Sequence, residues 1–292
     1  MNKANYLADG DVQNFVVWLA GQLDAIPIKL NIPRSKFVPT AVVNVQITGL
    51  TNVIPSHYHW KAKGAPSGTW KATNVRLARL ANMLRQAVAK GDDVRAFRAC
   101  CSILNWGGDR NSANGATPFL RDMGSGLCAY IKNAGVALSL STATLAAPKS
   151  PVNRMNSMLT KIHALYSTDG LPIYDSRVAA AIATLVEMWR RSTGAPLKAT
   201  PRLLIFPATL STRSVKQKYP DAASPGTFSY DKKYVTTTTN RWTEAKVRLG
   251  WLMSEVLSKN QAAFDGPSAS LASRMRSMEA SLFMVGYDVA CL

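Results

Sequence analysis

A lysine and an aspartate fourteen positions apart are the residues of this chain best placed to do chemistry. Lys161 lies near the end of an apolar segment predicted to be helical, and Asp175 stands where the next helix is predicted to begin. A lysine amine is a nucleophile only when it is neutral, and burial in an apolar cleft lowers its pKa toward that state. An aspartate at a helix N-cap accepts backbone N–H bonds, which keeps it ionised. The pair predicts a site where a fixed carboxylate activates an amine or a water molecule.

The same two groups suit the cleavage of a bond between a base and a sugar. The anomeric carbon, C1′, becomes positively charged as the base leaves, and a nearby carboxylate stabilises that charge. A simpler interpretation stays open, because an aspartate at an N-cap often only caps its helix. A lysine at the edge of an apolar helix often extends to water.

The charge balance predicts a polyanionic partner. The chain has 292 residues with 35 Lys and Arg against 17 Asp and Glu, a formal net charge of +18. Such an excess is typical of proteins that bind DNA, RNA or an anionic membrane surface, although a basic surface can also serve solubility. Hydrophobic residues make up 47% of the chain, enough for a sizeable core in one large domain or two lobes.

Other classes of protein are disfavoured. The four cysteines (Cys100, Cys101, Cys128 and Cys291) form no CxxC pair, and the three histidines add no ligand-spaced cluster. We therefore expect neither structural zinc nor a disulfide framework. The chemistry proposed for the lysine and the aspartate requires no metal or organic cofactor. The sequence shows no secretory leader and no apolar run long enough to cross a membrane. We expect a monomeric cytoplasmic protein with no membrane partner, associated with the nucleoid if it is bacterial.

Helical periodicity dominates the chain. Asp11, Asp92 and Asp175 are predicted N-caps, and Gly91, Gly107 and Gly194 are predicted to end helices. The predicted helices cover 12–23, 73–90, 93–106, part of 114–145, 154–166, 176–192, 241–259 and 270–289. Residues 26–72 are broken by prolines and predict extended chain and loops, with one short strand at 41–47.

Two segments interleave basic and aromatic residues in a way that favours nucleic acid. Cations neutralise phosphates, and flat rings stack on an extruded base. Residues 57–71 contribute Lys61, Lys63 and Lys71, and residues 198–248 contribute Arg213, Lys216, Lys218, Lys232 and Lys233. Arg177 follows Asp175 closely enough to reach a phosphate, while Trp60, Trp106 and Tyr174 are the candidates to line a base pocket or stack on a base. The alternative is that the rings only anchor long loops and the lysines are solvated.

Lys161 within TKIHALY and Asp175 within LPIYDSRVAAAI resemble the active-site segment of a known enzyme superfamily. It is the helix-hairpin-helix DNA glycosylase superfamily, and especially its 8-oxoguanine DNA glycosylase-like branch. There, a lysine after a hairpin turn opens a helix, and a loop leads to an aspartate at the start of another. The segment ILNWGG at 103–108 is similar to one in bacterial proteins of that fold. The resemblance covers about residues 75–192, but the usual Gly-x-Gly before the lysine is absent, and MNSMLTK stands there.

The resemblance implies a mostly α, two-lobed, helix-hairpin-helix glycosylase-like fold with a few short strands. Residues 73–194 would form a helical catalytic lobe, and 1–72 with 195–292 a second lobe with basic loops. It implies a DNA glycosylase that flips a modified base out of double-stranded DNA and excises it, in base-excision repair or in defence against phage with modified DNA. Lys161 would attack C1′ and allow an associated lyase step, or Asp175 would orient water. The alternatives are a catalytically inactive, sequence-independent DNA-binding protein of the same fold and an RNA-binding protein.

Overall fold

Helices make up most of the structure, which confirms the predicted mostly α class. The computed structural model describes residues 1–32, 34–38, 43–62, 67–109, 115–145, 151–194, 200–206 and 238–289. The helices are α1 (Lys3–Leu7), α2 (Gly10–Gln22), α3 (Val53–His57), α4 (Trp70–Ala89), α5 (Asp93–Gly107), α6 (Ala116–Asp122), α7 (Leu127–Ala137), α8 (Leu159–Tyr166), α9 (Ser176–Ser192), α11 (Thr238–Lys259) and α12 (Leu271–Val285). None of the helices in the described part of the chain combines the length and apolarity needed to span a membrane.

A single small sheet is present in the described ranges. Strands β1 (Pro27–Ile32) and β2 (Val43–Thr48) pair antiparallel, with Pro27 opposite Thr48. The prediction missed β1 because its flanking prolines suggested a loop. The sequence does carry the alternating pattern of a strand, because Ile28, Leu30 and Ile32 alternate with other residues, and the structure buries all three. The strand expected at 41–47 corresponds to β2.

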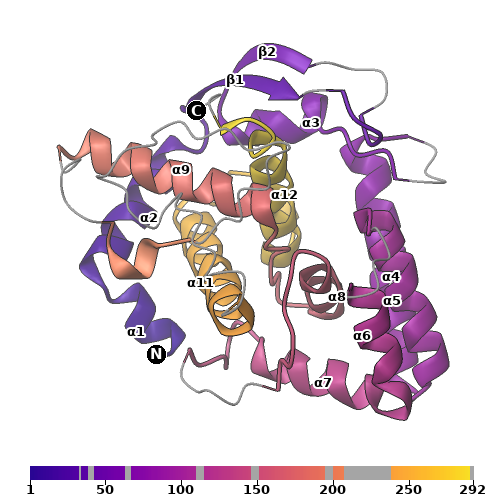
Figure 1. Ribbon diagram of the computed structural model, residues 1–292. Coiled ribbons are helices and arrows are strands. Elements are labelled where there is room, and N and C mark those ends of the chain that lie inside the picture. The colour runs from indigo at the N-terminus through magenta and orange to yellow at the C-terminus, as the bar shows by residue number, and fades with distance from the viewer. Residues whose placement is uncertain are drawn as a thin grey trace.

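The helices fall into two packed groups (Figure 1). In one group α4 packs on α5, α7 and α8, and α6 packs on α5. In the other, α11 packs on α1, α2 and α12, while α12 also contacts α3 and β1. Helix α9 packs on α12 and α2, so it belongs with the second group although the sequence placed it in a lobe covering 73–194. Lys161 on α8 and Asp175 before α9 therefore come from different groups.

The helix starts show where capping was predicted correctly. Asp175 caps α9 and Asp92 caps α5, as expected. Helix α2 is capped by Asp9, whose Oδ1 accepts two backbone N–H bonds at 3.1 Å, so the choice of Asp11 was wrong. Helix α4 begins at Trp70 behind a Thr69 cap, earlier than the predicted Thr73.

The start of α8 also differs from prediction, and the difference bears on the site. The predicted helix at 154–166 begins only at Leu159. Asn156 sets this start, because its Oδ1 accepts the N–H bonds of Met158 at 2.9 Å and Leu159 at 2.8 Å. The described residues 138–145 and 151–158 contain no helix, so the short helix-hairpin arrangement implied by the resemblance is not found in them ahead of Lys161.

Candidate active site

Lys161 is buried on the inner side of α8. Only 5% of the residue is exposed, and its Nζ donates a hydrogen bond to the Ser157 carbonyl oxygen at 2.6 Å. Burial lowers the pKa of the Lys161 amine below its ordinary value, while the negative charge of Asp175 partly opposes this. The shift is in the direction that a nucleophilic amine requires.

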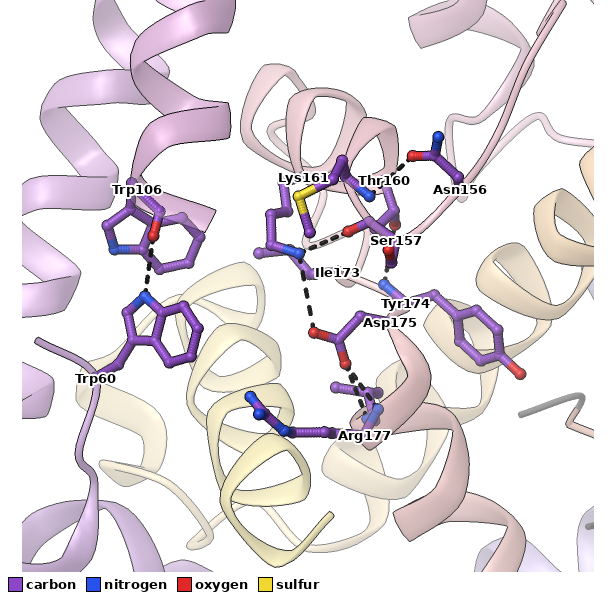
Figure 2. Close-up of polar contacts among 12 residues, drawn as sticks. Trp60, Trp106, Asn156, Ser157, Thr160, Lys161, Ile173, Tyr174, Asp175 and Arg177 are labelled. Atoms are coloured by element: carbon purple, nitrogen blue, oxygen red, sulfur yellow. Dashed lines mark hydrogen bonds and ion pairs between the residues drawn. The ribbon is translucent and has the colours of Figure 1, made fainter. Parts of the chain in front are cut away.

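Asp175 divides its two carboxylate oxygens between two tasks. Oδ1 accepts the backbone N–H bonds of Arg177 at 3.0 Å and Val178 at 3.1 Å, which caps α9. Oδ2 lies 3.9 Å from Lys161 Nζ. Figure 2 shows the two side chains pointing toward each other from α8 and from the start of α9. Because the cap fixes the carboxylate, Oδ2 is held facing the amine.

The neighbours of these two residues are bonded to each other, and this clamp sets their spacing. Thr160 Oγ1 accepts the backbone N–H of Tyr174 at 3.0 Å (Figure 2). The buried amine of Lys246 on α11 donates to Thr160 Oγ1 at 2.9 Å and to the Thr160 carbonyl at 3.1 Å. It also donates to the carbonyl oxygen of Pro172. The segment leading to Asp175 is thereby tied to α8 beside Lys161.

Removing the Thr160 hydroxyl should weaken this clamp. We expect Thr160→Val to lower the free energy of unfolding by about 1–3 kcal/mol, because it leaves a buried N–H and a buried amine short of partners. Thr160→Ser keeps the hydroxyl and should retain most of the stability. Denaturant unfolding of the two variants checks this, and equal stability of Thr160→Val and the native chain would contradict it.

Lys161 and Asp175 open onto a cavity of about 650 Å³. Seven of the residues that line it are aromatic, and they come from segments far apart in the sequence. The aromatic lining residues are Phe37, Tyr58, Trp60, Trp70, Trp106, Phe283 and Tyr287. A volume between about 300 and 1,000 Å³ is typical of sites for small ligands, and this cavity lies within that range.

Trp60 is the centre of the aromatic wall. Its Nε1 donates to the carbonyl oxygen of Trp106 at 3.1 Å, as Figure 2 shows. Its ring stacks on Phe37 with centroids 3.8 Å apart and planes at 13°. Phe283 meets it edge-on at 5.3 Å. These contacts fix the orientation of the ring and hold this part of the cavity wall in place.

Arg177 projects into the same cavity and is held by ring faces. Its guanidinium carbon lies 3.8 Å from the ring centroid of Tyr287, 4.9 Å from Phe283 and 5.8 Å from Trp60. Within the described part of the chain no acceptor bonds this guanidinium, so its N–H donors are available to a ligand.

No protein-family model, curated protein or solved structure matches this chain. The case for a function therefore rests on the geometry of the site. Among the residues that the structure describes, no group of three or more His, Cys, Asp or Glu side chains is placed to hold a metal ion.

Apart from Tyr174, the predicted site residues divide into three sets. Lys161, Asp175, Arg177, Trp60 and Trp106 all line the cavity. Lys61 and Lys71 are exposed and are not part of its lining. The remaining predicted DNA contacts lie outside the described residues, namely Lys63, Arg213, Lys216, Lys218, Lys232 and Lys233.

Tyr174 is the one predicted pocket residue that the structure places elsewhere. It is fully buried, and its ring packs edge-on against Trp242 at 5.5 Å. The expectation that it stacks on a base is wrong, because successive residues of the extended segment point to opposite sides. Its neighbour Asp175 faces the cavity instead.

Sequence reasoning missed several members of the site. Glu279 on α12 is buried in the cavity wall, accepts the backbone N–H of Ile173 at 2.7 Å and pairs with Arg276. Burial raises the pKa of Glu279, and the Arg276 charge opposes the rise. Lys246 was missed as well. Both lie within amphipathic helices that gave no local sign of a polar role, since only tertiary packing brings them to the site.

Proposed function

We propose that this protein is a DNA glycosylase that accepts an everted, modified nucleotide in the cavity and cleaves its base–sugar bond. The observation that carries the proposal is the buried amine of Lys161. It lies 3.9 Å from the helix-capping carboxylate of Asp175, on the wall of a cavity that is lined in part by aromatic rings. Perturbed titratable groups in a cavity are a common mark of a catalytic site. The net charge of +18 supports a polyanionic substrate.

The reaction begins with attack by the neutral Lys161 amine on C1′. The C1′–N bond breaks, and its electron pair leaves with the base, which takes a proton from solvent. Asp175 stabilises the positive charge at C1′ and accepts the proton that the attacking nitrogen loses. Opening of the sugar ring then gives a Schiff base, with a proton moving to O4′. Solvent then takes a proton from C2′, a double bond forms between C2′ and C3′, and the 3′ phosphate leaves with the electron pair of its bond to C3′, which is the lyase step.

A second route uses the same carboxylate without the amine. Asp175 would orient a water molecule toward C1′, the base would leave, and an abasic site would remain. Both routes require the nucleotide to leave the duplex, because C1′ is not accessible within the base stack. The biological role follows from the base removed, with repair of an oxidised base and defence against phage carrying modified DNA as the two proposals.

The proposal is tested by incubating the protein with duplexes that carry different modified bases, then with alkali, which breaks strands at abasic sites. Genomic DNAs with natural base modifications extend the range of substrates. We expect strand breaks at one class of modified base. Salt-sensitive DNA binding without base release from any substrate would support the alternative, a binding protein without catalysis, which the net charge alone also fits.

The lowered pKa of the Lys161 amine predicts how the rate of base release depends on pH. Burial lowers the pKa of this amine, and only the neutral amine attacks. Single-turnover base release should therefore rise with pH and level off above the lowered pKa. Asp175 raises the pKa of Lys161, so removing its charge should move the residual profile to lower pH. A rate that falls as the pH rises from about 6 to about 9 would contradict an attacking amine.

Gly107 provides a test that changes no chemical group at the site. A Cβ at this position would lie 2.5 Å from Lys161 Cδ and 2.8 Å from Cε. We expect Gly107→Ala to displace the amine and to slow base release by up to about 100-fold. Gly21→Ala is the matched control, because a Cβ on this helical glycine meets nothing within 4 Å. Equal rates for the two variants would show that the position of Lys161 does not matter.

A further inference from the structure

A short basic loop forms one side of the cavity mouth. Residues 34–37 line the cavity, and the side chains of Arg34 and Lys36 are exposed there. The Lys36 amine lies 4.8 Å from the ring centroid of Phe37. Neither of these basic residues was singled out from the sequence, because two charges in a proline-broken segment carry no periodic signal.

The loop is fixed to the wall of the cavity. Ser35 and Val38 exchange backbone hydrogen bonds of 3.1 and 3.0 Å, which closes a tight turn. The Phe37 carbonyl accepts the backbone N–H of Lys61 at 2.8 Å, so exposed Lys61 is held beside the loop. The Phe37 ring stacks on Trp60 and occupies space that a side chain at Gly108 would fill. A fixed loop holds its charges in place before a ligand arrives.

Among the lining residues that the structure describes, the exposed charges at the mouth are of one sign. The acidic residues of the cavity wall, Asp175 and Glu279, are 7% and 6% exposed. The exposed charged residues of the lining, Arg34 and Lys36, are basic. A polyanion that approaches the cavity therefore meets cations first, and the carboxylates stay behind them.

When a nucleotide enters the cavity base first, its own phosphates stay at the mouth. No glycine-rich turn precedes Lys161 to offer backbone N–H groups to those phosphates. We infer that Arg34, Lys36 and Lys61 grip the phosphates that flank the everted nucleotide. Arg34 can donate two parallel hydrogen bonds to one phosphate, while the lysines act as point charges. The inference rests on the proposed function for the entry of the base. Contact between the three cations and the phosphates is measured by DNA binding and does not require base release.

The test compares two variants that lose the same charge. One carries Arg34→Gln, Lys36→Gln and Lys61→Gln. The matched control carries Lys90→Gln, Arg98→Gln and Lys132→Gln, which replace exposed residues of the helical group α4–α8 that do not line the cavity. Binding to an undamaged duplex and to one with a stable abasic analogue is measured over a range of salt concentrations.

We expect the mouth variant to lower the salt dependence, the slope of log K against log salt, by about 2 to 3, since each lost phosphate contact removes about 0.9. The control should lower it by less than about 1. Equal slopes for the two variants would overturn the inference. If the mouth variant melts at a lower temperature, Arg34→Gln and Lys36→Gln are measured singly, each with an expected decrease of about 0.9.

The outcome separates this inference from the proposed function. A lower slope in the mouth variant, together with no base release by the native protein from any substrate, supports the grip and rejects the glycosylase. Base release with equal slopes rejects the grip and leaves the glycosylase in place.

Discussion

Asp175→Asn will slow base release by about 100- to 10,000-fold, the range usual for loss of a catalytic acid or base. The variant removes the charge that faces Lys161 at 3.9 Å and that would stabilise C1′. It does not remove the cap, because an asparagine Oδ1 accepts the same two backbone N–H bonds. The loss should therefore be chemical, with the melting temperature little changed, and single-turnover kinetics with thermal melts check both parts.

One control variant and one argument from the pKa of Lys161 make the result for Asp175 specific. Asp175→Ala also loses the cap and should lower the free energy of unfolding by about 0.5–2 kcal/mol. Stability and activity should therefore both fall in Asp175→Ala, whereas only activity falls in Asp175→Asn. Protonation of Lys161 cannot explain the slow rate of Asp175→Asn, since removing the carboxylate lowers the pKa of the amine further. A variant Asp175→Asn with the native rate would remove the carboxylate from the mechanism.

Lys161→Gln is expected to abolish strand cleavage and to slow base release by at least about 100-fold. Glutamine keeps a polar group on a side chain that is shorter by one atom, and it is not a nucleophile. Lys161→Met is the companion variant, because it fills the same space without a polar group. Both variants are assayed for base release, with alkali, and for strand cleavage, without it.

The two readouts of Lys161→Gln distinguish the two routes. Loss of both activities supports attack by the amine. Native base release without strand cleavage would assign base removal to water oriented by Asp175. That result would contradict the amine route while leaving the cavity as the place of reaction.

The parts of the site that could be predicted from sequence are those fixed by local structure. Asp175 caps α9 because the residue type and the apolar periodicity after it define a helix start. The apolar pattern also predicted correctly that Lys161 lies on a helix. The expectation that it lies near the end of that helix was wrong, because α8 begins only at Leu159 and Lys161 lies in its first turn. Their convergence was an expectation from chemistry and resemblance, and the structure places their side chains 3.9 Å apart.

The parts that could not be predicted depend on long-range packing. The cavity wall joins Trp60, Trp106 and Phe283, whose segments share no local pattern. The packing of α9 on α2 and α12 is also long-range, because α9 is buried on most of its surface and its own sequence does not name its partners. Tyr174 was misplaced because a one-residue step along an extended segment reverses the side that a residue faces.

The most direct measurement is the identity of the residue captured on DNA. The native protein is incubated with its substrate duplex and borohydride, which reduces a Schiff base to a stable bond, and the cross-linked peptide is identified by mass spectrometry. We expect the DNA to be attached to Lys161, with no adduct in Lys161→Gln. Attachment to another lysine, or base release with no adduct at all, would contradict attack by Lys161 on C1′.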